Sequence, residues 1–115
     1  MKLVVDFETR SMADLKKSGA PRYAQDPTTE VLCLSYGWED GDDVYTWFPG
    51  DPLPVDIEVC IRSCDGKLVA HKASFEKWIW RSIMVPEYGW PDVPDEQWED
   101  TLAMAAYRNL PQALD

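Results

Sequence analysis

A chain of 115 residues with 45% hydrophobic residues can form a single folded domain with one core, which excludes an intrinsically disordered protein. No apolar stretch approaches the roughly 20 residues needed to cross a bilayer, and no signal-peptide pattern precedes the first one, so a cytoplasmic protein is expected. The net charge of −10 argues at first sight against binding to phosphates. Residues 36–66 hold most of the excess acid, however, whereas residues 1–35 hold five acids and five bases, so charge alone excludes no partner.

The three cysteines form no recognisable disulfide or metal pattern. Cys60 and Cys64 lie four residues apart in an expected helix, and Cys33 lies in an expected strand. An odd number of cysteines without metal-ligand spacing favours reduced core thiols over a disulfide framework or a zinc site.

The first half of the chain predicts three strands. Residues 3–9 begin with the apolar sequence Leu-Val-Val and form the first strand. Residues 10–30 are expected to be irregular, with one or two helical turns over residues 12–17, because one glycine and two prolines interrupt any longer element. Residues 31–38 and 44–48 are rich in β-favouring side chains and flank an acidic turn with a glycine, so they predict a hairpin.

A helix, a strand and a second helix are expected next. Residues 55–64 place apolar side chains on one helical stripe, and residues 67–70 form a short apolar strand. The following helix is expected to be capped by Ser74. Its apolar stripe has helical spacing and consists of Phe75, Trp78, Ile79 and Ile83.

The last part of the chain predicts a long loop and a helix. Residues 85–97 contain three prolines and are expected to be held down by Trp90 and Trp98. A final helix is expected over residues 101–107. This order of elements predicts an α/β domain with a mixed sheet flanked by helices. It is expected to be C-terminally incomplete, because another helical pattern begins where the chain reaches Asp115.

Two carboxylates end the first strand. Asp6 and Glu8 lie two positions apart, so their side chains share one face of the strand while Phe7 takes the other. Adjacent carboxylates repel each other unless a cation lies between them, and hard divalent cations prefer such oxygen ligands. The alternative is that both side chains merely solvate a strand end.

A second group of polar residues follows the strand at residues 67–70. His71 lies in the turn after this strand, and Glu76 lies in the first turn of the next helix. A structural alternative exists for each, since the helix dipole favours Glu76 and a histidine at a strand end commonly makes a hydrogen bond in a turn. Four cations are expected to cluster around this histidine: Lys67, Lys72, Lys77 and Arg81.

Together these segments resemble a known enzyme family. Asp6-Phe7-Glu8-Thr9 and the later His71-x-Ala73-x-Phe75-Glu76 resemble the first two motifs of the DEDD (DnaQ-like) 3′–5′ exonucleases, which have the ribonuclease H-like fold. Further similarity to the proofreading exonuclease domain of phage family A DNA polymerases lies in Tyr23-Ala24, Ser35-Tyr36 and Asp100-Thr101. The resemblance implies that residues 1–115 are a partial exonuclease domain, which in a phage protein would act in the bacterial host cytoplasm.

The resemblance also implies a role for each matching residue. Glu76 takes the place of the second-motif aspartate, and Lys72 takes the place of a common asparagine that faces DNA. The implied ligands of two Mg²⁺ or Mn²⁺ ions, which are also the implied catalytic residues, are Asp6, Glu8 and Glu76. The implied substrate-binding residues at the 3′ end of single-stranded DNA are Thr9, His71, Lys72 and Phe75, and Asp100 is the implied supporting carboxylate.

The third motif of the family, which supplies a Tyr or His and an Asp, is absent from this sequence. Tyr107 is not followed four residues later by an aspartate. The complete family site hydrolyses phosphodiesters with two metal ions. We therefore expect exonuclease activity that is absent or lower by about 10³-fold or more, as single-group losses at such sites typically are.

Two other functions remain open from the sequence. The first is a catalytically dead module that grips single-stranded nucleic acid or a protein partner, through the cations around Lys72 and exposed aromatics such as Trp80 and Trp90. The alternative for these aromatics, favoured by the general burial of tryptophan, is that they are core and loop anchors. The second is a plain α/β scaffold whose acid pairs are coincidental. Further expected partners are the rest of a DNA polymerase and a second copy of the chain, bound through a sheet face that lacks a covering helix.

Overall fold

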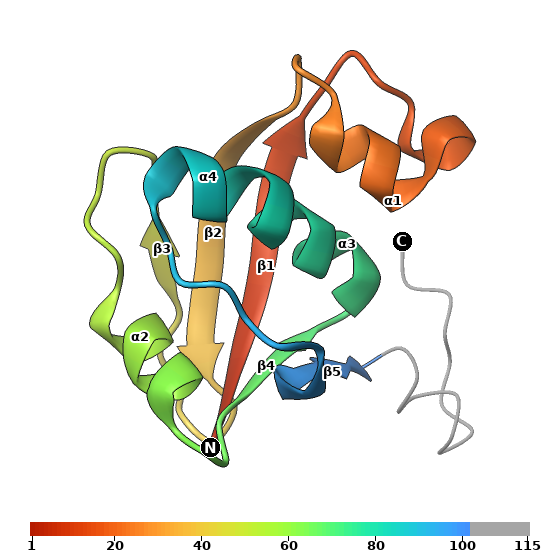
Figure 1. Ribbon diagram of the computed structural model, residues 1–115. Coiled ribbons are helices and arrows are strands. Elements are labelled where there is room, and N and C mark those ends of the chain that lie inside the picture. Colours follow the sequence, from red (N-terminus) through yellow and green to blue (C-terminus); the bar gives the residue numbers. More distant parts are fainter. Residues whose placement is uncertain (102–115) are drawn as a thin grey trace.

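Five strands form one mixed sheet in the computed structural model, which describes residues 1–101 (Figure 1). Across the sheet the strands follow the order β3-β2-β1-β4-β5. Their bounds are Lys2–Arg10 (β1), Glu30–Trp38 (β2), Tyr45–Trp47 (β3), Lys67–Ala70 (β4) and Trp98–Asp100 (β5). The first three strands pair antiparallel, whereas β4 runs parallel to β1 and β5 runs parallel to β4. The predicted α/β fold with a mixed sheet is confirmed and is compatible with a ribonuclease H-like fold.

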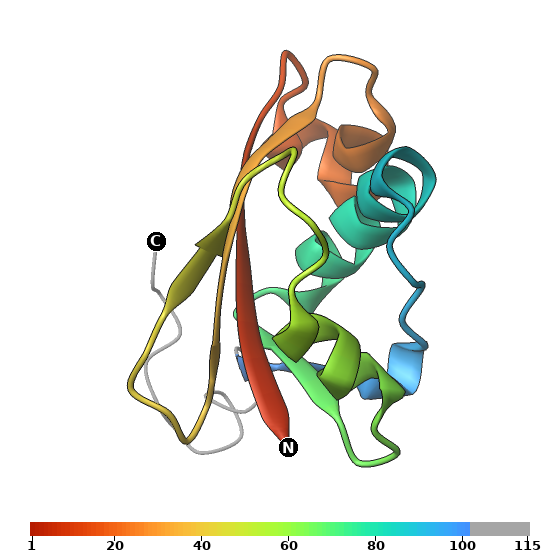
Figure 2. The same cartoon turned by 90° about the vertical axis from the view of Figure 1, so that its left-hand side faces the viewer.

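The described helices all lie on one face of this sheet (Figure 2). They are α1 (Leu15–Gln25), α2 (Val55–Arg62), α3 (Ala73–Ile79) and α4 (Val85–Tyr88). The alternation of side chains along β1 fits helices on one face only. Leu3, Val5 and Phe7 are buried beneath the helices, while Val4 on the opposite face is 40% exposed. Within residues 1–101, no helix has the length and apolarity that crossing a membrane requires.

The expectation that residues 10–30 are largely irregular is wrong, because they contain α1. Asp14 caps this helix by accepting a hydrogen bond from the Lys16 main-chain N–H at 3.0 Å. Gly19, with φ of 79°, divides the helix into two short pieces. Pro21 is tolerated because it lies in the first turn of the second piece, where its missing N–H has no partner to lose.

The segment after β4 is more helical than expected. The predicted Ser74 cap is wrong, since the N-cap is Lys72 without a side-chain hydrogen bond and Ser74 lies inside α3. A π-helical segment, Trp80–Met84, joins α3 to α4, so the expected loop over residues 85–97 begins with a helical turn. Strand β5 was not expected because its three residues, Trp-Glu-Asp, show no apolar alternation. The helix expected over residues 101–107 lies, beyond its first residue, outside the described residues.

An aromatic cluster fills the core between the helices and the sheet. The ring centroids are 4.9 Å apart for Trp47–Trp90, 5.2 Å for Trp80–Trp90 and 5.7 Å for Trp80–Trp98, each pair edge to face. The predicted anchoring by Trp90 is confirmed, because this residue is buried and the Trp80 indole donates to the Pro91 carbonyl at 2.9 Å. The burial of Trp80 and Trp90 confirms that these aromatics are core and loop anchors, so they do not offer the exposed rings that the binding-module alternative requires.

The cysteines are free thiols in three different environments. Cys60 is buried and its Sγ donates to the Lys67 carbonyl at 3.2 Å, whereas Cys33 is half-buried and Cys64 is exposed. The prediction of core thiols therefore holds for Cys60 and is wrong for Cys64.

We predict that Gly66→Ala lowers the free energy of unfolding by about 2–3 kcal/mol. A Cβ at this position would lie 1.9 Å from the Cys60 carbonyl oxygen, and neither backbone can withdraw easily because the Gln97 side chain donates to the Gly66 carbonyl at 3.2 Å. Gly41→Ala is the matched control, since its Cβ would meet only atoms at 3.5 Å or more. Urea unfolding measures both variants, and equal stability of the two would contradict this account.

Candidate active site

The candidate site lies where β4 separates from β1. The parallel pairing of these strands ends at Val4 and Val69, and the chain then turns from β4 into α3. The main-chain N–H of Phe7, farther along β1, therefore has no strand partner on this edge. It donates instead to Oε2 of Glu76 at 3.0 Å, in a buried hydrogen bond. Such crevices at the carboxyl ends of parallel strands are the usual ligand sites of open α/β sheets.

Glu76 is a buried carboxylate with few charged groups to balance it. Its side chain comes from the first turn of α3 and is 5% exposed. Burial raises its pKa from 4.5 to about 8. The Phe7 N–H opposes this rise, while the nearby negative charges of Asp6 and Glu8 add to it. The structure thus brings the three predicted carboxylates into electrostatic contact.

A pocket of about 250 Å³ opens beside Glu76. It collects five of the residues predicted from the sequence, namely Asp6, His71, Lys72, Phe75 and Glu76. Phe7 and Leu15 complete its lining. Sequence reasoning missed Leu15 because its position depends on α1, and it missed the Phe7 N–H because main-chain groups leave no mark in the sequence.

The remaining predicted site residues lie around this pocket and do not line it. Glu8 is exposed at the end of β1 and acts on Glu76 through its charge. The Thr9 hydroxyl lies 3.0 Å from the Tyr23 hydroxyl, and the Tyr23 ring contacts that of Phe75 with centroids 5.7 Å apart. Tyr23, which the sequence singled out only as part of the family resemblance, therefore connects the end of β1 to α3.

Asp100 lies at the end of β5 beside the turn that carries His71. It is paired in register with Ala70, the last residue of β4. The hydroxyl of the next residue, Thr101, lies 3.4 Å from Nδ1 of His71 and donates to the Ala70 carbonyl at 3.4 Å. The structure therefore places Asp100 at the same sheet edge as the pocket but outside its lining.

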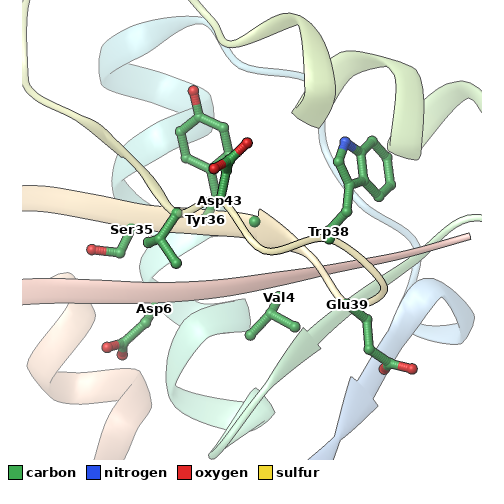
Figure 3. A pocket seen from close by; sticks show the side chains of 10 residues that line it. Val4, Asp6, Ser35, Tyr36, Trp38, Glu39 and Asp43 are labelled. Atoms are coloured by element: carbon green, nitrogen blue, oxygen red, sulfur yellow. The ribbon is translucent and has the colours of Figure 1, made fainter.

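A second pocket, of about 340 Å³, lies on the helix-free face (Figure 3). Asp6 lines this pocket as well, together with Val4 of β1 and Ser35 of β2. Its charged lining residues are all acids, since the other two are Glu39 and Asp43. The pocket beside Glu76 contains Lys72 and His71, so it is the better candidate for an anionic substrate.

The donor chemistry of the site suits a hard divalent cation. Asp6 and Glu76 line one pocket, and burial raises the pKa of Glu76, with a smaller contribution from the charges of Asp6 and Glu8. Carboxylate oxygens are the ligands that such cations prefer. Among residues 1–101 no group of three or more His, Cys, Asp or Glu side chains is arranged to hold a metal ion. The described chain thus offers a pair of carboxylates in one pocket, with Glu8 nearby and outside it.

Comparison with known proteins places this chain near a polymerase. A DNA polymerase of Bacillus phage SP02 is 31% identical to it over 114 residues. The matched region covers 98% of this chain and 17% of that polymerase, so the chain spans about one sixth of its relative. No protein-family model matches the sequence. The chain is therefore similar to one part of a phage DNA polymerase.

We predict that the metal-free protein loses stability as pH rises from about 5 to about 8. Because the folded pKa of Glu76 is above its ordinary value, the folded state binds the proton more tightly than the unfolded state, and this advantage disappears once both states ionise. Glu76→Gln can still accept the Phe7 hydrogen bond and cannot ionise. At pH 8 it should therefore be more stable than the wild type by about 2–4 kcal/mol, and at pH 5 by less than about 1 kcal/mol.

Urea unfolding in the presence of a chelator at several pH values measures this difference. Glu39→Gln, at an exposed carboxylate, is the matched control and should follow the wild-type curve. Parallel pH profiles for the wild type and Glu76→Gln would show that Glu76 ionises normally in the folded protein.

Proposed function

We propose that this chain is part of a 3′–5′ exonuclease unit of a DNA polymerase, acting on the 3′ ends of single-stranded DNA. The observation that carries the proposal is the buried Glu76 carboxylate, which shares a pocket with Asp6 beyond the carboxyl end of β4, where β4 separates from β1. The similarity to a phage DNA polymerase supports this context. A phage enzyme of this kind would work in the cytoplasm of its bacterial host, with the rest of the polymerase as its partner.

The proposed chemistry is phosphodiester hydrolysis. Asp6, Glu8 and Glu76 would hold Mg²⁺ or Mn²⁺, with Asp100 as a supporting carboxylate at the same edge. Such ions supply a nucleophilic hydroxide from bound water and stabilise negative charge on the leaving oxygen. Binding of a cation requires Glu76 to give up the proton that its burial favours.

The other proposed roles concern the substrate. Lys72 is exposed at the pocket and would attract a phosphate as a point charge, and His71 lies beside it. Phe75 is half-buried in the pocket wall, where its ring offers a surface for the terminal nucleotide. Thr9 would contact the 3′ end from the strand, held by its hydrogen bond to Tyr23.

The second candidate function is a binding module without catalysis. Its predicted basis is largely removed by the structure, because Trp80 and Trp90 are buried. Lys77 and Arg81 form ion pairs with Asp95, and Lys67 donates to the Glu96 carbonyl. What remains at the pocket is Lys72 with Phe75, which would still attract single-stranded nucleic acid weakly.

We predict slow, Mn²⁺-dependent shortening of single-stranded DNA from its 3′ end. The assay uses a 5′-labelled oligonucleotide, and Asp6→Ala should abolish the reaction because Asp6 is the exposed carboxylate of the pocket. Asp56→Asn, on α2, is the matched control and should retain wild-type activity. Absence of shortening with Mn²⁺ would contradict a working catalytic site within this chain, and binding of the same oligonucleotide would then favour the binding module.

Self-association through the helix-free face stays a prediction. Val4 and Val44 are exposed there beside the second pocket, and apolar area of this kind is often covered by another chain. Size-exclusion chromatography with light scattering measures the mass, and a monomer at all concentrations would contradict the prediction.

A further inference from the structure

Helix α1 is a positively charged element in an acidic chain. Its sequence, Leu-Lys-Lys-Ser-Gly-Ala-Pro-Arg-Tyr-Ala-Gln, contains three cations and no acid. Since the whole chain has a net charge of −10, the residues outside α1 carry −13. The acids that flank the helix are engaged in local hydrogen bonds, with Asp14 accepting from the Lys16 N–H and Asp26 accepting from the Thr28 N–H and hydroxyl.

The cations of α1 have no carboxylate partner within residues 1–101. Lys16, Lys17 and Arg22 are exposed and form no ion pair there, and the same is true of Lys72 at the mouth of the pocket. The cations that do pair with carboxylates in this part of the chain are Lys2, Arg10, Arg62, Lys77 and Arg81. Lys67, at the start of β4, also has no carboxylate partner there, but it is half-buried and donates to the Glu96 carbonyl. The exposed cations without a carboxylate partner in residues 1–101 are thus those of α1 and Lys72 in the adjacent turn before α3.

Both ends of α1 adjoin the candidate active site. Leu15, its first residue, lines the pocket together with Lys72 and Phe75. Near the other end, the Tyr23 ring packs against Phe75. Figure 1 shows α1 beside α3, and the view in Figure 2 agrees. A polyanion that enters the pocket would therefore pass close to Lys16, Lys17 and Arg22.

The dimensions of α1 suit a few nucleotides. A continuous helix of eleven residues at 1.5 Å each is about 17 Å long, which corresponds to about five stacked nucleotides at 3.4 Å. The break at Gly19 divides the cations of α1 into two groups, Lys16 with Lys17 and Arg22. Leu15 is 40% exposed and Met12 is 86% exposed, so apolar side chains for bases or sugars accompany the cations. Exposed cations with apolar neighbours, beside a pocket that contains Lys72, are the combination of groups by which proteins bind single strands.

We propose that α1 is a binding surface for the phosphate backbone of single-stranded DNA, which guides the strand toward the pocket beside Glu76. This inference rests on the proposed function in one respect, namely that the DNA runs toward the pocket with its 3′ end. The binding itself requires no hydrolysis, so it can be measured independently. The surface contributes mainly electrostatic affinity and reads no sequence, because its cations meet phosphates and not base edges.

The experiment measures fluorescence anisotropy of a labelled oligothymidylate of about 12 nucleotides, with chelator present, between about 50 and 200 mM salt. Each phosphate contact contributes about −0.7 to the slope of log affinity against log salt for single strands. The Lys16→Gln, Lys17→Gln, Arg22→Gln triple variant should therefore lower the magnitude of the slope by about 2. Its affinity at the lowest salt should fall by about 10-fold or more.

Two controls isolate the surface. Arg22→Gln and Arg62→Gln remove the same type of side chain, and Arg62 lies on α2 with its side chain 78% exposed. Only Arg22→Gln should weaken binding.

A dinucleotide, which carries a single phosphodiester, should bind the wild type and the triple variant almost equally. All substituted side chains are exposed, so circular dichroism should show unchanged folding.

Each outcome decides the proposal. A triple variant with wild-type slope and affinity overturns it even if the chain hydrolyses DNA, which would leave the proposed function standing. If Arg62→Gln weakens DNA binding as much as Arg22→Gln does, binding depends only on the net charge of the protein, and the proposal is also overturned. Wild-type protein that binds no oligothymidylate at low salt overturns it as well, and α1 is then better explained as a contact for an acidic protein segment. A lower slope in the triple variant, combined with no shortening of DNA in the separate Mn²⁺ assay, supports the surface and counts against hydrolysis by this chain.

Discussion

The hydrogen bond between the Phe7 main-chain N–H and the Glu76 carboxylate attaches helix α3 to strand β1. At this point β4 has left β1, and a buried N–H without a partner would cost about 1–3 kcal/mol. Glu76 removes that cost and fixes the first turn of α3 against the edge of β1. Beyond Val4, the Glu76 side chain takes the place of β4 as the hydrogen-bond partner of β1, and the pocket lies beside this side chain.

The same bond creates an electrostatic conflict. The carboxylate that accepts the hydrogen bond is buried and faces the charges of Asp6 and Glu8, so its pKa is raised to about 8. A proton relieves the conflict, and a divalent cation would do so as well. The ionised Glu76 carboxylate therefore lowers folding stability in the free protein, and buried acids of this kind are common at functional sites.

The sequence was informative wherever one local pattern decided the structure. The apolar run of β4 gave its bounds, Lys67–Ala70, and strand alternation placed Asp6 and Glu8 on one face of β1. The sequence was uninformative wherever the structure depends on contacts between segments that are far apart in the chain. Helix α1 contains Gly19 and Pro21, which locally oppose a helix, and the pairing of Lys77 and Arg81 with Asp95 depends on a loop that no local pattern places. Five predicted site residues converge in the pocket, but the main-chain N–H that holds Glu76 could not be inferred from side-chain types.

The edge-to-face indoles of the core connect the two edges of the sheet. Trp47 belongs to β3 and Trp98 to β5, and Trp80 and Trp90 bridge the space between them. Rings held rigidly in such asymmetric surroundings produce circular dichroism in the near ultraviolet, whereas the backbone dominates the far ultraviolet. Four of the six tryptophans thus report on one contact chain across the domain. Loss of the near-ultraviolet signal alone would reveal a molten globule, in which the strands persist but their two outer members no longer share a packed interior.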